Sequence, residues 1–276
     1  MSLSRLCPGL GGGVATRATS SGAPAGGGAA FANEWSIECD GTGDFMEAAV
    51  SVDFYALSVW FKPDSTYTQT GPIGCVVGFD AQKGVYLGGD LVGILDPEKE
   101  IIDVASLDRT ENWAYASTGA LTIDTNWHHI AVSWRASSAT NSGSAGYDVW
   151  LDGVKVGNDY GKYYGSSMTS PYAITQIRAG DTEVDSTSHN PYYPFAGHID
   201  EVAIFDAILS DANIATLYNS GNGAIDLSEE SFYGDCTGWW RMGDNNGGTG
   251  TTVTDVKSGN DGTLTNTDQF VEVVPS

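Results

Sequence analysis

No long apolar run occurs in the 276 residues, whereas a membrane-spanning helix needs about 18 such residues in succession. Near the N-terminus, Arg5 is followed by glycine, serine and threonine, which interrupt any apolar core of a cleaved signal peptide. We therefore expect no membrane partner and no secretion through such a signal.

Basic residues are scarce. The chain has 12 Lys and Arg against 35 Asp and Glu, which gives a net charge of −23. A charge of this sign repels nucleic acid, so we expect no nucleic-acid partner. The first 33 residues hold only Arg5 and Arg17 and no acid, whereas the remainder holds 10 basic and 35 acidic residues.

Residues 1–33 are also low in complexity, being rich in glycine, alanine, serine and threonine. Such a composition predicts a flexible arm with no core of its own. We expect neighbouring chains in a larger assembly to hold it, with Arg5 and Arg17 as its assembly contacts on an acidic surface.

Closely spaced cysteine pairs are missing. The four cysteines contain no CxxC, so neither a zinc site nor a small disulfide scaffold is expected: Cys7, Cys39, Cys75 and Cys236. Cys39 and Cys75 lie in apolar strand patterns and should act as small buried side chains. We expect all four to be reduced.

Catalytic signatures are absent too. The chain has neither Gly-x-Ser-x-Gly nor His-Glu-x-x-His, and no nucleophile motif accompanies His128 and His129. We expect these histidines at the edge of the sandwich, one facing in and one out. Glycoside hydrolases need two carboxylates facing a cleft, and the acids at 183–206 do not complete the pattern expected on one strand. The chain is predicted not to be an enzyme.

Short strands bounded by glycine and aspartate dominate what is present. The run WHHIAVSW (127–134) alternates, with Ile130, Val132 and Trp134 on one face, and Asp152-Gly153 suits a two-residue hairpin turn. Further strands are expected at 35–39, 56–61, 73–79, 84–87, 91–95, 147–151, 154–156 and 174–179. This spacing predicts an all-β, two-sheet antiparallel sandwich over residues 34–276.

Residues 195–221 combine a strand with one short helix. The alternation of Ile199, Val202 and Ile204 predicts the strand, and Ile214, Leu217 and Tyr218 share one helical face. Ser210 is the expected N-cap of this helix, and Leu209 and Ile214 are expected to form a hydrophobic staple across it. Gly221 is expected to close the helix.

Four segments resemble laminin-G-like jelly rolls of the concanavalin A-like lectin superfamily. In family order they are WSIECDGTGDF (35–45), WHHIAVSW (127–134), VWLDGV (149–154) and FAGHIDEVAIF (195–205) with the following helix. The resemblance implies a jelly-roll sandwich. It implies less about function, because lectins, adhesion modules and structural proteins share this fold.

The C-terminal segment carries a second resemblance. GWWRMGD (238–244), TTVTD (251–255) and SGNDGT (258–263) are similar to a piece that usually precedes the opening strand, as if the chain were circularly permuted. This order of segments and the sequence GWWRMGD resemble those of proteins of tailed bacteriophages. The resemblance implies a virion protein on the particle surface, assembled in the host cytoplasm, with other virion proteins and further copies of the chain as partners.

The superfamily resemblance also implies a structural calcium ion between the opening turn and the Asp-Glu-Val strand. Its ligands here would be Asp40 or Asp44 together with Asp200, and calcium prefers such oxygen ligands. The alternative is that Asp40 only starts a turn by bonding its own backbone, while Asp200 faces water.

Two tyrosine-rich loops, 160–172 and 189–194, are candidates for contact with glycans or proteins. Tyrosine combines a flat apolar face with a polar tip, so Tyr163, Tyr164 and Tyr192 could stack on sugar rings. The alternative is that such rings pack the loops onto the sandwich.

The leading interpretation is a non-enzymatic phage structural protein, a capsid decoration or fibre component. Its sandwich would be displayed, its arm docked to neighbours, and a host surface glycan bound as an added role. The alternative is a soluble carbohydrate-binding lectin or adhesion module. A hydrolase whose acids meet only in three dimensions is a third interpretation.

Overall fold

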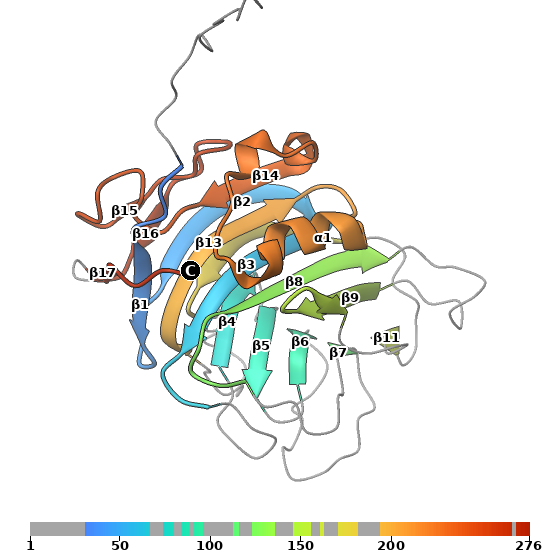
Figure 1. Ribbon diagram of the computed structural model, residues 1–276, viewed down its shortest axis with the longest axis horizontal. Helices are drawn as coiled ribbons and strands as arrows, with labels where there is room; N and C mark the ends of the chain where they lie inside the picture. Colours follow the sequence, from blue (N-terminus) through green and yellow to red (C-terminus); the bar gives the residue numbers. More distant parts are fainter. Residues whose placement is uncertain are drawn as a thin grey trace, which may run out of the picture. The chain divides into compact units, whose positions relative to one another are not determined.

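Two antiparallel sheets form the part of the chain that the structure describes (Figure 1). This computed structural model describes residues 31–66, 74–79, 84–88, 91–95, 113–115, 123–135, 146–155, 161–162, 171–181, 194–266 and 269–276. The chain divides after Ala30, and all of these residues belong to the unit Phe31–Ser276.

Among the described strands, the first sheet has eight members. Its order is β10 (Val154–Lys155), β9 (Gly146–Leu151), β8 (His128–Arg135), β3 (Ala56–Pro63), β13 (Ala196–Phe205), β1 (Ser36–Asp40) and β17 (Phe270–Val271), and β14 (Cys236–Trp240) also pairs with β13.

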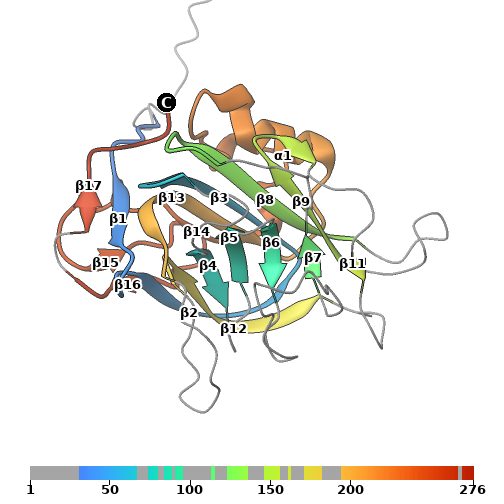
Figure 2. The same cartoon turned by 90° about the horizontal axis from the view of Figure 1, so that it is seen from below.

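The second sheet has nine described strands. Its order is β11 (Gly161–Lys162), β7 (Trp113–Tyr115), β6 (Leu91–Leu95), β5 (Gly84–Gly88), β4 (Gly74–Phe79), β12 (Tyr172–Ala179), β2 (Met46–Phe54), β16 (Gly262–Leu264) and β15 (Thr252–Val253). The two sheets face each other as layers (Figure 2), so the predicted antiparallel jelly-roll sandwich is confirmed.

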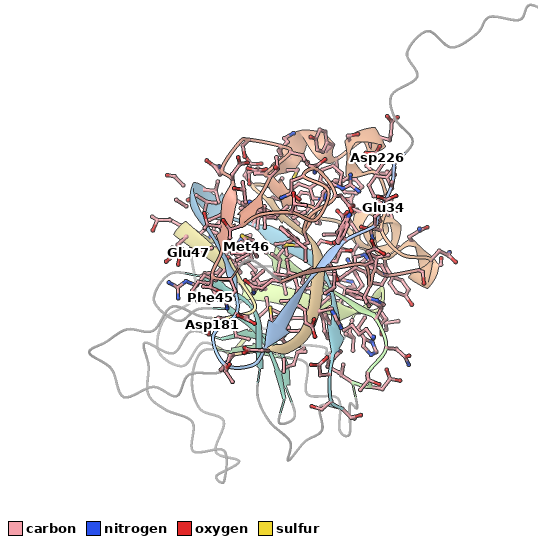
Figure 3. All side chains as sticks on the ribbon, turned by 90° about the vertical axis from the view of Figure 1, so that its left-hand side faces the viewer. Glu34, Phe45, Met46, Glu47, Asp181 and Asp226 are labelled. Carbon is pink, nitrogen blue, oxygen red and sulfur yellow. The ribbon has the colours of Figure 1, made fainter. Side chains whose placement is uncertain are left out.

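The main core lies between the sheets and follows the period of two that strands impose. Ile130, Val132 and Trp134 of β8 all belong to it, as the alternation predicts. At the start of β2, Met46 is fully buried, while its neighbours Phe45 and Glu47 are only partly buried (Figure 3). The alternation of apolar side chains therefore sets which face of each strand enters the core.

A second, smaller core lies on the other face of the first sheet, beneath α1 (Asp211–Tyr218) (Figure 1). Ala131, Ala203 and Phe205 of the sheet join Ile214 and Leu217 of the helix in it. Three short 3₁₀ turns follow α1 in the chain: η2 (Asn219–Gly221), η3 (Leu227–Glu229) and η4 (Tyr233–Asp235).

Both ends of α1 show their caps. The Ser210 hydroxyl accepts the Asn213 amide proton at 3.2 Å, and the Asn213 side chain accepts the Ser210 amide proton at 3.0 Å, which confirms the N-cap. The predicted closure at Gly221 is wrong. Asn219 ends the helix instead, with a left-handed φ of 51° that asparagine tolerates better than most residues.

The C-terminal segment contributes strands to both sheets. β14 pairs with β13, β17 pairs with β1, and β16 pairs with β2. The Ser36 hydroxyl donates to the Val273 carbonyl at 2.6 Å, which holds the last residues against β1.

The predicted burial of Cys39 and Cys75 is confirmed, because both side chains are fully buried. Within the described ranges, no helix is long and apolar enough to cross a membrane.

Candidate functional site

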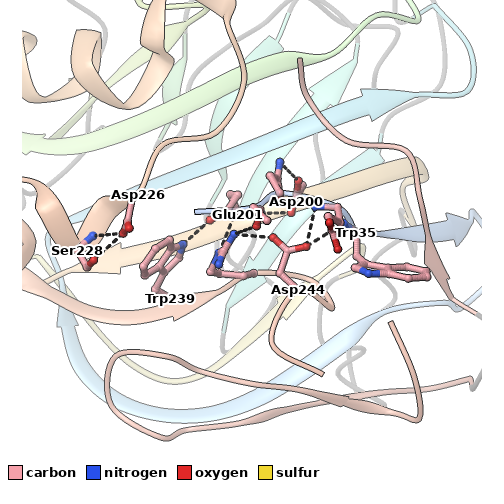
Figure 4. Close-up of polar contacts among 11 residues, drawn as sticks. Trp35, Asp200, Glu201, Asp226, Ser228, Trp239 and Asp244 are labelled. Atoms are coloured by element: carbon pink, nitrogen blue, oxygen red, sulfur yellow. Dashed lines mark hydrogen bonds and ion pairs between the residues drawn. The ribbon is translucent and has the colours of Figure 1, made fainter. Parts of the chain in front are cut away.

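A buried polar cluster on β13 joins the first residues of the Phe31–Ser276 unit to residues 239–244 of its C-terminal segment (Figure 4). We call it the Arg241 cluster, made up of Asn33, Asp200, Glu201, Trp239, Arg241 and Asp244. Arg241 Nε donates to Glu201 Oε1 at 3.0 Å, and its Nη2 donates to Asp244 Oδ2 at 2.6 Å. Trp239 Nε1 donates to the other Glu201 oxygen at 2.5 Å.

An irregularity in β13 brings two successive carboxyl groups into this cluster. The register between β13 and β3 shifts between Asp200 and Ala203, and Glu201 has a left-handed φ of 49°. Regular alternation would send Asp200 and Glu201 to opposite faces of the sheet. The bulge instead lets Glu201 reach Arg241 while Asp200 reaches Asn33.

The cluster also fixes the first residues of the unit. Asp244 Oδ1 accepts the amide protons of Glu34 and Trp35 at 2.8 and 2.9 Å. Arg241 Nη2 donates to the Ala32 carbonyl at 2.5 Å, and its guanidinium lies 4.2 Å from the centre of the Phe31 ring. Residues 31–35, which we call the arm root, are therefore attached to the segment that follows β14.

Burial raises the pKa values of the three acids in the cluster. Their exposed fractions are 0% for Asp200, 6% for Glu201 and 3% for the Asp244 side chain. Burial, and next the neighbouring Glu201 carboxyl, raises the pKa of Asp200 well above its usual range. Burial raises the pKa of Glu201 to about 7, although Arg241 and Trp239 oppose the change.

Burial likewise raises the pKa of Asp244, against the hydrogen bonds from Glu34 and Trp35. Glu201 and Asp244 thus share one guanidinium, while Asp200 bonds the Asn33 side chain of the arm root. The arrangement therefore attaches the arm root and the C-terminal segment to β13.

The residues predicted to hold calcium do not come together. Asp40 pairs with Ala196 in the β1–β13 register, so Asp200 lies four residues further along, about 13 Å away. The Asp40 carboxylate instead accepts the Thr42 amide proton at 2.7 Å and closes its own turn, and Asp44 accepts from Asn266. The predicted set is therefore corrected: Asp40 and Asp44 share one rim, and Asp200 is buried far from it.

Asp200 also does not face water, as the alternative for it supposed, because its carboxylate accepts from Asn33 Nδ2 at 2.9 Å. Among the residues that the structure describes, no group of three or more His, Cys, Asp or Glu side chains is arranged to hold a metal. The residues in place therefore do not fit the implied calcium site, and calcium binding elsewhere stays a prediction.

The other predicted contacts are outside the described residues: Tyr163, Tyr164, Tyr192, Arg5 and Arg17. The two histidines lie on opposite faces of β8. His128 contacts the core residue Phe61, with ring centres 5.7 Å apart, and fully buried His129 lies near Tyr218 of α1, with ring centres 6.1 Å apart.

Sequence reasoning missed one structural centre, the Asp255 turn. The Asp255 carboxylate accepts the amide protons of Trp239, Lys257 and Asn260 at 2.9 to 3.0 Å, and the Ser258 hydroxyl proton at 2.8 Å. These bonds lower its pKa although burial opposes them. An aspartate three residues before a Ser-Gly-Asn sequence was the available signal for this turn.

Sequence reasoning also missed the roles of Asn33, Glu201, Arg241 and Asp244. The only signal was one arginine directly after two tryptophans in an acidic chain.

Comparison with solved structures finds the same architecture elsewhere. A candidate carbohydrate binding protein from Bacteroides ovatus ATCC 8483 aligns with 11% identity and a TM-score of 0.55, over 88% of this chain and 61% of that protein. The chain therefore spans less than two thirds of that relative.

Two other structures align less closely. A heptameric SAP-like pentraxin from Limulus polyphemus aligns over 67% of this chain and 82% of its own, with 12% identity and a TM-score of 0.40. Domain 4 of the extracellular arabinanase AbnA from Geobacillus stearothermophilus, solved with arabinotriose, aligns over 66% and 75%, with 17% identity and a TM-score of 0.37.

Sequence comparison places the chain more specifically. No curated protein sequence matches it. Residues 40–215 match the Laminin_G_3 family model, which is described as the concanavalin A-like lectin/glucanases superfamily. This match covers more than half of the chain and includes the strands from β2 to β13 and most of α1. The chain belongs to the Laminin_G_3 family of the concanavalin A-like lectin/glucanases superfamily.

Proposed function

We propose that the chain is a non-catalytic carbohydrate-recognition module. The observation that carries the proposal is the lectin-type sandwich itself, complete with its C-terminal strands and matched to the lectin/glucanase family over residues 40–215. The Bacteroides ovatus relative, a candidate carbohydrate binding protein, supports the same ligand class.

The state of the acids supports recognition over hydrolysis. A glycosidase needs one carboxyl group that donates a proton and a second that acts as base or nucleophile at an open cleft. Asp200, Glu201 and Asp244 are instead covered by the arm root and the C-terminal segment. Asp255 accepts four hydrogen bonds within its own turn and a fifth from Trp239 of β14. These acids hold the fold together.

A glycan array probed with the full chain tests the proposal. The expected result is binding to a defined subset of glycans, lost in Tyr163→Ala or Tyr192→Ala and retained in Tyr233→Ala, a half-buried tyrosine of the C-terminal segment. Unchanged melting temperatures show that the variants are folded. Absence of binding by the unaltered chain contradicts the proposal, and binding unaffected by either loop variant assigns the sugar to another surface.

A narrower role, display on a bacteriophage particle, is our second proposal. The permuted order of the C-terminal sequence motifs supports it. The arm root supports it too, because the Arg241 cluster holds Ala32 and Glu34 in place. In this role the arm docks to neighbouring virion proteins or to further copies of the chain, and the sandwich is displayed on the particle surface.

Deletion of residues 1–30 tests the second proposal. Phe31, Ala32 and Asn33 must be kept, because they contact Arg241 and Asp200. The expected result by light scattering is assembly of the full chain and a folded monomer after deletion, with glycan binding unchanged. A full chain that stays monomeric with and without partner virion proteins contradicts the role of the arm.

A further inference from the structure

His128 stands between two carboxylates at one rim of the sandwich. Its Nδ1 lies 2.8 Å from Asp152 Oδ2, and its Nε2 lies 3.2 Å from Asp124 Oδ1. Asp152 belongs to the turn between β9 and β10, and Asp124 to the turn that precedes β8. One imidazole thus spans two turns from different parts of the chain.

The geometry requires both ring nitrogens to donate. An ionised carboxylate only accepts hydrogen bonds, while a neutral imidazole carries one N–H and one lone pair. A lone pair facing a carboxylate oxygen is repelled, so only the imidazolium satisfies both contacts. Hydrogen bonds from Asn126, the largest of which comes from its backbone, lower the pKa of Asp124, whose side chain is 54% exposed, and so keep it ionised.

The same carboxylates also hold backbone groups of the two turns. Asp152 Oδ1 accepts the His129 amide proton at 2.9 Å, and Asp124 Oδ1 accepts the Asn126 amide proton at 2.8 Å. Asp152 adopts a left-handed φ of 49° to do so. Loss of the His128 charge therefore loosens contacts that position both turns.

Among the residues that the structure describes, Asp152 and Asp124 are the charges that act on the imidazole. On β3 the contact is the uncharged ring of Phe61, and Lys62 lies on the alternate face, opposite His198 of β13. Asp152 and Asp124 raise the pKa of His128 above its ordinary value of 6.5, although burial alone, the largest influence, lowers it.

We propose that His128 is a pH-dependent clasp, which as an imidazolium ties the turn at 124–127 to the turn at 152–153 and releases them when it loses its proton. The clasp is closed below the pKa of the folded-state imidazole and opens as the pH rises through it. This inference does not depend on carbohydrate binding or on display on a particle.

Nitrogen NMR of the full chain tests the protonation state. At pH 6.5, the ordinary pKa of histidine, both ring nitrogens of His128 are expected to carry protons in most molecules, while His198, whose pKa burial lowers, serves as the neutral reference. In Asp124→Asn the imidazole is expected to lose its proton at lower pH, with the fold retained because position 124 is exposed. A neutral His128 in the unaltered chain below its ordinary pKa overturns the proposal.

Hydrogen exchange tests the opening. Above the pKa of His128, protection of the His129 amide is expected to fall about tenfold relative to the Trp239 amide, which Asp255 holds at the same distance of 2.9 Å. In His128→Gln this pH-dependent loss is expected to vanish. Equal protection of both amides across the titration overturns the clasp, whatever the protonation state.

Discussion

Arg241 Nε donates to Glu201 Oε1 at 3.0 Å, and this pair is buried where the arm root crosses the C-terminal segment. Replacement by Arg241→Ala leaves the carboxyl groups of Glu201 and Asp244 without their cation. Because such uncompensated burial is strongly unfavourable, the free energy of unfolding is expected to fall by about 3–5 kcal/mol. Urea denaturation measures this loss.

Lys155→Gln is the control for that measurement. Lys155 pairs with Asp148 at 2.7 Å, but its side chain is 38% exposed, so water screens the pair. Its loss is expected to lower the free energy of unfolding by about 1 kcal/mol or less. Equal effects of the two substitutions would contradict the structural role of Arg241.

The Asp255 turn provides a second prediction. In Asp255→Asn, an amide group replaces one of the two accepting oxygens, so it meets either the backbone amide of Lys257 at the Oδ1 position or that of Asn260 at the Oδ2 position. We expect the free energy of unfolding to fall by about 2–3 kcal/mol, since buried donors lose their acceptor. Chemical denaturation compares it with Asp235→Asn, an exposed position where little change is expected. Similar losses at both positions would be evidence against the turn.

These two centres show where sequence reasoning ends. The alternation of Ile130, Val132 and Trp134 and the cap at Ser210 are local patterns, so they were predictable. The bonds from Asp244 to Glu34 and Trp35 span 210 and 209 residues, and no local pattern encodes them.

The backbone irregularities could not be predicted from the sequence for a related reason. The left-handed Glu201 in the middle of a strand, which lets it face Arg241, is a tertiary requirement that overrides local preference. Asn219 ended α1 two residues before the glycine that local rules favour. The residues predicted to hold calcium lie apart because a motif gives the residues but not the strand register between them.

The lowered pKa of His129 leads us to expect that the free energy of unfolding depends on pH. Burial lowers the pKa of this histidine to about 3, against an ordinary 6.5. The unfolded chain therefore takes up a proton as the pH falls through 6.5, and the folded chain does so only near 3, so acid favours unfolding.

Unfolding free energies at about pH 7 and about pH 4.5 check this prediction. The unaltered chain is expected to lose more stability between the two conditions than His129→Gln, in which Nε2 can still reach the Ser58 hydroxyl 2.8 Å from the histidine. His128, present in both proteins, cancels from the comparison. An identical pH dependence would show that His129 is accessible to protons.

Gly153 in the hairpin turn lies against Tyr218 of α1. A methyl group at position 153 would come within 2.5 Å of a ring carbon, and the φ of +71° adds backbone strain. We expect Gly153→Ala to lower the free energy of unfolding by about 1–3 kcal/mol. Gly234→Ala, with nothing within 4 Å of the added carbon, is the matched control. Relief of part of the loss in the double variant with Tyr218→Ala would identify the ring as the obstacle.

Carbohydrate binding by this lectin-type sandwich is measured by calorimetric titration of the full chain with representative neutral and acidic oligosaccharides. We expect saturable heat of binding with at least one sugar class, lost in Tyr163→Ala or Tyr192→Ala. Heats no larger than those of dilution for every sugar would contradict it.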